Sequence, residues 1–220
     1  MIYSIIIPVY NEINNLPILI DALKYYDSNE IIIVDDGSND GSLKILESTS
    51  FIKLITLKSN FGKGVAIRAG LACASNDPII ILDSDMEIHP KIIDKLAILN
   101  KEKNIRCILG YRYEDYNQLK SFWDYGNYLL TRLFNFIYQS KHKDSLCCAK
   151  AFYKKDLGLL DFSSNGFDID VEITAILTKK FKNINSIQVP YKRRSKKEGK
   201  KLRFIDAFLI IKRIIITKLK

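Results

Sequence analysis

The stretch of this sequence that decides the fold is Ile79-Ile80-Ile81-Leu82-Asp83-Ser84-Asp85-Met86-Glu87. The four consecutive apolar residues that follow Pro78 are typical of a strand buried on both faces, as in a parallel sheet. The strand ends in Asp83 and Asp85, one residue apart, with Glu87 two residues further on. Acidic side chains at the carboxyl end of such a strand lie where open α/β sheets bind their ligands.

These neighbouring carboxylates predict a divalent metal ion. Carboxylates this close repel one another unless a cation neutralises them. Hard oxygen ligands suit Mg²⁺ or Mn²⁺, and Mg²⁺ commonly binds through one or two carboxylates together with substrate phosphates. Because the Asp-x-Asp pattern is common, the alternative from this stretch alone is a solvated acidic turn after a strand.

The composition indicates a folded protein with a basic tail. A chain of 220 residues suits one domain, or one domain with a short appendage. Its hydrophobic fraction of 47% and charged fraction of 27% are those of a folded soluble protein. Residues 192–220 hold twelve Lys and Arg residues against two acids, a net charge of +10. This tail predicts an anionic partner, which is a phosphate group, an anionic membrane surface or nucleic acid.

The cysteines and the lengths of the apolar runs indicate in which cellular compartment we expect the protein. Cys73, Cys107, Cys147 and Cys148 fit no zinc motif, and the last two, being adjacent, are poor disulfide partners. The amino-terminal residues lead straight into a strand and do not resemble a signal peptide. No apolar run reaches the roughly 20 residues needed to span a bilayer. We therefore expect free thiols in a cytoplasmic protein.

Strand and helix patterns alternate along the first part of the chain. We expect strands at residues 3–9, 30–34, 52–57 and 79–82, and helices at residues 15–25, 40–46 and 65–74. Asn14 is expected to cap the first of these helices, and Asp40 to open the second. The alternation indicates βαβ units and a doubly wound sheet.

Acidic residues follow three of these strands. Glu12, Asp35-Asp36 and Asp83-Ser84-Asp85 each stand at a strand's carboxyl end. Because right-handed connections place those ends on one edge of the sheet, the three clusters should converge. An edge lined with acids would repel a phosphate-bearing ligand unless a metal intervened, which supports the metal site.

The chain after residue 88 is less regular. We expect helices at residues 90–100, 121–140 and 171–181, strands at 106–110, 147–153 and 184–189, and a basic loop at 192–201. From residue 202, an apolar stripe with cationic flanks predicts an amphipathic helix. Such a helix could bind at an anionic membrane surface; the alternative is that its charged face is simply solvated. The aromatic cluster Phe122-Trp123-Tyr125-Tyr128 fits either a helix core or a membrane-facing surface. We divide the chain into a main domain, 1–201, and a basic amphipathic helix, 202–220.

Several segments resemble a known family. The segments Ile5-Ile6-Ile7-Pro8-Val9-Tyr10-Asn11-Glu12, Ile33-Val34-Asp35-Asp36-Gly37-Ser38 and Asp83-Ser84-Asp85 resemble the motifs of family 2 glycosyltransferases. The segments Gly62-Lys63-Gly64-Val65-Ala66-Ile67-Arg68, Asp85-Met86-Glu87-Ile88-His89-Pro90, Gly166-Phe167-Asp168 and Glu198-Gly199-Lys200-Lys201 resemble its dolichyl- and polyprenyl-phosphate sugar transferase branch. The resemblance implies a GT-A fold, a Rossmann-like doubly wound mixed α/β sheet flanked by helices, and transfer of a sugar from a GDP- or UDP-linked donor.

The same resemblance implies roles for individual residues. The positions that match the family's nucleotide-sugar-binding residues are Pro8, Tyr10, Glu12, Val34, Asp36, Asp83, Ser84 and Asp85. The positions that match its metal ligands are Asp83, Asp85 and Glu87, and those near the acceptor phosphate are Arg112, Arg194, Lys200 and Lys201. Asp85, Arg112 and Arg194 are the implied catalytic residues. Two features depart from the branch: a second arginine after Arg112 has no clear counterpart, and the carboxyl-terminal membrane spans of some relatives are absent.

Structural alternatives exist for several of these positions. Pro8 and Val34 can be ordinary strand residues, and Asp35 can cap the following helix through its side chain. The Gly62-Lys63-Gly64 segment is weak evidence for a phosphate loop, because no Gly-Lys-Ser/Thr follows it. Its glycines fit an unusual turn near the nucleotide instead.

The sequence leads to one preferred function and two alternatives. The preferred one is an inverting, metal-dependent transfer of a hexose to a polyprenyl phosphate, which is already ionised near neutral pH and needs no general base. The first alternative is transfer to a saccharide hydroxyl in surface-glycan synthesis, with Asp168, Asp170 or Glu172 as the base. The second is a non-catalytic, membrane-associated nucleotide-binding module. We expect a peripheral protein on the cytoplasmic face of a membrane, and no recognised motif supports nucleic-acid binding.

Overall fold

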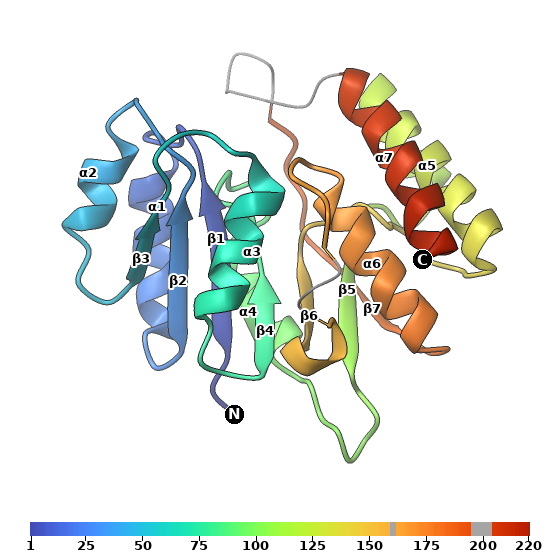
Figure 1. Cartoon of the computed structure of the whole chain (residues 1–220), viewed down its shortest axis with the longest axis horizontal. Coiled ribbons are helices and arrows are strands. Elements are labelled where there is room, and N and C mark those ends of the chain that lie inside the picture. Colours follow the sequence, from blue (N-terminus) through green and yellow to red (C-terminus); the bar gives the residue numbers. More distant parts are fainter. Residues whose placement is uncertain (159–161, 195–203) are drawn as a thin grey trace.

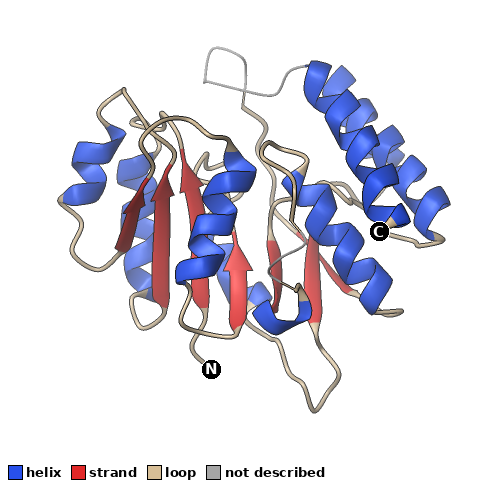
Figure 2. Cartoon of the chain, in the orientation of Figure 1, coloured by secondary structure: helices blue, strands red, loops and turns tan. Residues whose placement is uncertain are grey.

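The computed structural model describes residues 1–158, 162–194 and 204–220. A single seven-stranded sheet lies between helices on its two faces, as Figures 1 and 2 show. The strands are β1 (Ser4–Val9), β2 (Glu30–Asp35), β3 (Lys53–Thr56), β4 (Pro78–Ile81), β5 (Cys107–Tyr111), β6 (Lys150–Tyr153) and β7 (Asn185–Gln188). The helices are α1 (Leu16–Leu23), α2 (Ser42–Glu47), α3 (Lys63–Cys73), α4 (Ile93–Leu96), α5 (Phe122–Tyr138), α6 (Ile169–Lys180) and α7 (Phe204–Leu219).

The sheet is mixed, which confirms the expected fold class. Its strand order is β3-β2-β1-β4-β6-β5-β7. The first four strands in this order are parallel, whereas β6 runs antiparallel between β4 and β5. The carboxyl ends of β1, β2 and β4 therefore lie at one edge, where the three acidic clusters were expected.

Alternation along the strands divides the core between the two faces. In β1, Ile5 and Ile7 pack into one apolar cluster with α1 and α4, and Ile6 packs into a second cluster with α3 and α6. Every residue of β1 is buried, which explains the continuous apolar run. Gly70 of α3 lets that helix approach the sheet, because a Cβ there would lie 2.5 Å from the Ile6 side chain.

The carboxyl-terminal helix α7 packs beside α5 and α6 (Figure 1). A third apolar cluster joins these helices, and it contains Phe134 and Tyr138 of α5 together with Ile210 and Ile214 of α7. The Tyr138 hydroxyl donates a hydrogen bond to the Ile214 carbonyl oxygen over 3.0 Å. In the described ranges, no helix combines the length and apolar character needed to cross a bilayer.

Some element boundaries differ from the sequence expectations. Asn14 is not the cap of α1; Asn15 takes that position, without a side-chain cap bond, and a proline stands in the first turn. The helix expected to reach Asn100 ends at Leu96, because Asn100 forms an isolated bridge with Ile105 instead. The strand expected from residue 147 begins at residue 150. The four cysteines are free, as expected.

Candidate active site

A pocket of about 410 Å³ lies at the edge of the sheet where β1, β2 and β4 end. The sequence-predicted residues that line it are Pro8, Tyr10, Glu12, Asp36, Asp83, Ser84, Asp85, Glu87, Arg112 and Arg194. The expected convergence of the acidic clusters is thus confirmed. Val34 does not line the pocket, because its side chain is fully buried in β2. Lys200 and Lys201 lie outside the described residues.

The loop after β4 orients the Asp83-Ser84-Asp85 segment. The Ser84 hydroxyl donates to the carbonyl oxygen of Pro8 over 2.9 Å, which joins this loop to the end of β1. The Asp85 carboxylate accepts a hydrogen bond from the Glu87 backbone N–H over 3.0 Å. Met86 between them has a positive φ of 59°, which is uncommon for a residue other than glycine. This tight turn directs the carboxylates into the pocket.

The loop between β3 and α3 is built around Asp36. The Asp36 carboxylate accepts hydrogen bonds from the backbone N–H groups of Phe61 and Gly62, each over 2.8 Å. Gly62 has a φ of 100°, and a Cβ there would lie 2.3 Å from the Asn165 carbonyl oxygen. Only glycine fits this turn without strain. Asp35 accepts from the backbone N–H of Ser38, so it stabilises the turn after β2 rather than capping α2.

Lys63 is the main residue of the site that the sequence argument did not select. It is the first residue of α3, and its Nζ lies 2.7 Å from both Asp83 Oδ1 and Asp170 Oδ2. Burial by itself would raise the pKa of Asp83, but the Lys63 ammonium beside it brings that pKa below its ordinary value. The same two carboxylates raise the pKa of Lys63 against the effect of its burial. Its place in the Gly62-Lys63-Gly64 segment is the sequence feature that points to it.

Arg194 bridges the remaining acids. Its Nη1 lies 2.9 Å from Glu12 Oε2 and its Nη2 lies 2.9 Å from Asp85 Oδ2. Burial, together with the charges of Asp83 and Glu87, raises the pKa of Asp85 to about 6, although the Arg194 charge opposes the shift. The pocket therefore holds more negative charge than its own cations neutralise.

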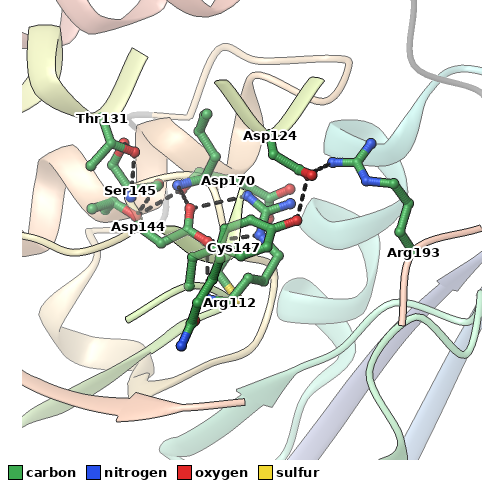
Figure 3. Close-up of polar contacts among 12 residues, drawn as sticks. Arg112, Asp124, Thr131, Asp144, Ser145, Cys147, Asp170 and Arg193 are labelled. Carbon is green, nitrogen blue, oxygen red and sulfur yellow. Dashed lines mark hydrogen bonds and ion pairs between the residues drawn. The ribbon is translucent and has the colours of Figure 1, made fainter. Parts of the chain in front are cut away.

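Arg112 also lines the pocket, and Asp144 fixes the position of its guanidinium (Figure 3). Its Nε lies 2.7 Å from Asp144 Oδ2 and its Nη2 lies 3.0 Å from Asp144 Oδ1, a bidentate pair. The guanidinium also lies over the ring of Tyr191, 5.5 Å from its centroid. Asp124 accepts hydrogen bonds from Tyr113 and Arg193 nearby. Sequence reasoning selected Arg112 but neither Asp144 nor Tyr191.

The lining side chains fit a divalent cation by their chemistry. Seven carboxylates and three cationic side chains line the pocket among the described residues. Hard oxygen donors in such excess suit Mg²⁺ or Mn²⁺. Across the described ranges, however, no three His, Cys, Asp or Glu side chains are arranged as a metal-ligand set. Lys63 and Arg194 hold oxygens of Asp83 and Asp85 in ion pairs instead.

Only one of the three acids considered as a general base lines the pocket. Asp170 does so, next to Lys63. Asp168 and Glu172 instead bind Arg213 of α7, with the closest oxygens 2.8 and 3.1 Å from the guanidinium nitrogens. Those two carboxylates therefore join α7 to the start of α6.

Comparison with known proteins agrees with this architecture. Residues 4–160 match the family described as Glycosyl transferase family 2. An undecaprenyl-phosphate 4-deoxy-4-formamido-L-arabinose transferase from Yersinia enterocolitica serotype O:8 is 43% identical over 109 residues, which are 45% of this chain and 33% of that protein. The chain thus matches only about a third of the length of this curated relative.

Solved structures share the fold at low sequence identity. Glucosyl-3-phosphoglycerate synthase from Mycobacterium tuberculosis, crystallised with Mn²⁺, UDP and phosphoglyceric acid, superposes with a TM-score of 0.78 at 17% identity over 99% of this chain and 78% of its own. Mannosyl-3-phosphoglycerate synthase from Rubrobacter xylanophilus gives a TM-score of 0.76 at 14% identity over 99% of this chain and 72% of its own. The fold is therefore GT-A-like, and the chain belongs to glycosyl transferase family 2.

Proposed function

We propose that this glycosyltransferase moves a hexose from a GDP- or UDP-linked sugar to a polyprenyl phosphate, such as dolichyl or undecaprenyl phosphate, with inversion of configuration. The observation that carries the proposal is the pairing of charges within one pocket. The carboxylates that follow β1 and β4 line the same 410 Å³ space as Arg112 and Arg194. Such a pocket suits two phosphate-bearing substrates. The carboxylates would bind one of them through a metal cation, and the arginines would bind the other directly.

On the donor side, Asp83, Asp85 and Glu87 would hold Mg²⁺ or Mn²⁺. The ion would neutralise the donor diphosphate and stabilise the negative charge of the leaving group. Pro8, Tyr10, Glu12 and Asp36 would bind the nucleotide, since they line the same pocket. The partial match to the undecaprenyl-phosphate transferase supports this class of reaction.

On the acceptor side, Arg112 would bind the lipid phosphate. Asp144 holds the guanidinium through two hydrogen bonds, so little freedom is lost when a phosphate binds to it. A polyprenyl phosphate is ionised near neutral pH and attacks without giving up a proton. The Lys200 and Lys201 side chains, on the basic segment after Arg194, are proposed to join this phosphate site.

A saccharide hydroxyl acceptor is the second candidate, and the position of Asp170 favours it. A hydroxyl must lose its proton as it attacks, and Asp170 is a carboxylate in the pocket. Its Oδ2 atom lies 2.7 Å from Lys63 Nζ, and this ion pair orients the carboxylate within the pocket. This reaction would place the chain in surface-glycan synthesis.

Membrane attachment is proposed from helices α5 and α7. Both expose large apolar side chains: Phe122, Leu129 and Phe136 on α5, and Ile205, Phe208 and Leu219 on α7. Lys212, Lys218 and Lys220 are exposed on or next to α7, so cations accompany this apolar surface. Apolar side chains flanked by cations are typical of binding to an anionic bilayer. We propose a peripheral protein on the cytoplasmic face of a membrane, where a lipid phosphate is accessible.

The test is an acceptor comparison with radiolabelled UDP- and GDP-sugars in the presence of Mn²⁺. We expect label in an acid-labile lipid when polyprenyl phosphate is supplied, and none with an oligosaccharide. Label that enters only the oligosaccharide would favour the hydroxyl acceptor. Nucleotide binding with no transfer to either acceptor would favour the non-catalytic binding module.

A further inference from the structure

Arg194 occupies an unexpected position for a residue that binds an acceptor phosphate. Its guanidinium contacts Glu12 and Asp85, each at 2.9 Å, and its backbone N–H donates to Glu87 Oε1 over 2.8 Å. The Arg194 side chain is 13% exposed, and those of Glu12 and Asp85 are 5% and 19% exposed. Arg194 therefore lies on the carboxylates that the donor and its metal are expected to use.

These contacts oppose metal binding at Asp85. Its Oδ2 atom accepts a hydrogen bond from Arg194 and its Oδ1 atom accepts one from the Glu87 backbone N–H, so a metal ion would compete with a donor at either oxygen. A guanidinium and a divalent cation on the same largely buried carboxylate also repel each other, and water screens this repulsion poorly. We therefore expect metal binding at Asp85 to displace Arg194.

The local structure favours displacement of Arg194 over displacement of Lys63. Lys63 is held within α3 by two carboxylates, and the next residue, Gly64, is hydrogen-bonded to the Asn165 carbonyl oxygen over 2.8 Å. Arg194 belongs to no helix or strand, and it follows the isolated bridge between Ile88 and Tyr191. A change in the backbone there disrupts no regular element.

We propose that Arg194 is the internal counter-cation of this site. In the free protein it neutralises Glu12 and Asp85; when a divalent cation binds, it leaves Asp85 and becomes available to a substrate phosphate. The proposal rests on the metal dependence of the proposed function and adds an order to it. The cation and the donor bind first, and the phosphate site gains Arg194 only afterwards.

The test compares Mn²⁺ binding by wild type, Arg194→Gln and Arg193→Gln without nucleotide, measured from the electron paramagnetic resonance of free Mn²⁺. Arg194→Gln is expected to bind Mn²⁺ about tenfold more tightly or better, the effect of a neighbouring opposite charge on a carboxylate. Arg193 pairs with Asp124 instead, so Arg193→Gln is the matched control and should leave the affinity unchanged. Equal or weaker binding by Arg194→Gln, or an equal gain in both variants, would overturn the proposal and leave the transferase function standing.

A second measurement uses the unmodified protein. Phenylglyoxal modifies accessible arginines, and peptide mass spectrometry reports the extent at Arg194 and Arg193 separately. Mn²⁺ should increase modification of Arg194 and leave Arg193 as it was; no change at Arg194 at saturating Mn²⁺ overturns the counter-cation role. Failure of wild type and Arg194→Gln to bind Mn²⁺, even with UDP or GDP added, would contradict the metal-dependent function as well.

Discussion

Lys63 Nζ lies 2.7 Å from Oδ1 of Asp83, and this ion pair joins the start of α3 to the end of β4. The ammonium is nearly buried, with 8% of the side chain exposed, and it also binds Asp170 at 2.7 Å. The first aspartate of the Asp83-Ser84-Asp85 segment is thus held in place by a residue 20 positions earlier in the chain. The pair fixes the position of a carboxylate that we propose binds the donor's metal ion.

Replacing Lys63 by methionine should therefore destabilise the fold. It leaves Asp83 without its ion-pair partner, and breaking a buried pair in this way costs roughly 3–5 kcal/mol. Urea unfolding followed by circular dichroism measures the loss. Lys24→Met is the control, because Lys24 and Asp21 form an exposed pair that contributes at most about 1 kcal/mol. Equal losses in the two variants would contradict the importance of the Lys63 pair.

Asp85→Asn should stabilise the protein at alkaline pH while removing activity. The pKa of Asp85 is raised to about 6, above its value in the unfolded chain. Between those two pKa values the folded protein binds more protons than the unfolded chain, so the free energy of unfolding falls as the pH rises. Removing the charge should raise the free energy of unfolding by roughly 1–3 kcal/mol near pH 8 and leave it unchanged near pH 3.

Thermal unfolding at both pH values checks this prediction for Asp85→Asn. Asp21→Asn is its control, because the Asp21 side chain is 76% exposed and should show no such pH-dependent gain. Transfer by Asp85→Asn should fall by roughly a hundredfold or more through loss of a metal ligand. A variant that is less stable than wild type near pH 8 would contradict the unfavourable charge at Asp85.

Arg112→Lys should impair use of the acceptor more than use of the donor. Lysine cannot form the bidentate contacts to Asp144, so the cation loses its orientation. We expect kcat/KM for the acceptor to fall by roughly a hundredfold, and Asp144→Asn to produce a smaller loss of the same kind. Steady-state kinetics with each substrate varied in turn measures the loss of kcat/KM for the acceptor and for the donor separately.

Arg106→Lys is the matched control for Arg112→Lys. Arg106 also forms a bidentate pair, with Asp156, but it does not line the pocket. Its substitution should lower stability without a selective effect on the acceptor. Similar kinetic losses in the two variants would show that Arg112 acts through stability alone.

Charged substitutions on α5 and α7 should weaken membrane binding. Phe136 and Phe208 are 83% and 64% exposed, so changing both to aspartate removes apolar contacts and adds charge without disturbing the core. Sedimentation with phosphatidylglycerol-containing vesicles measures binding. Ile18→Asp is the control, because Ile18 is 58% exposed on α1. If the double variant sediments as well as wild type, these helices do not bind the membrane.

Strands β1, β2 and β4 could be predicted because nearly all of their residues are buried. Strands β1, β2 and β4 lie within the sheet and are covered on both faces, so each shows an uninterrupted apolar run. The position of β6 could not be predicted, because nothing local in Lys150–Tyr153 specifies antiparallel pairing between β4 and β5. The early end of α4 likewise depends on the pairing of Asn100 with Ile105.

The candidate site, too, could be predicted from the sequence only in part. The acidic clusters could be brought together from sequence, because the connection rule places the carboxyl ends of parallel strands on one edge. The ion pairs that fix the cations of the site could not be predicted, since the pair of Lys63 with Asp170 spans 107 positions and that of Arg112 with Asp144 spans 32. Such pairs depend on how α6 and the segment after α5 pack, which no local pattern reports.

The central claim is that an ionised lipid phosphate attacks the sugar of a nucleotide donor. The most direct test is phosphorus and proton magnetic resonance of the lipid product formed from polyprenyl phosphate, sugar nucleotide and Mn²⁺. We expect a glycosyl phosphodiester whose anomeric configuration is opposite to that of the donor, and no product after chelation of the metal. A product with retained configuration, or a sugar found only on a hydroxyl group, would contradict it.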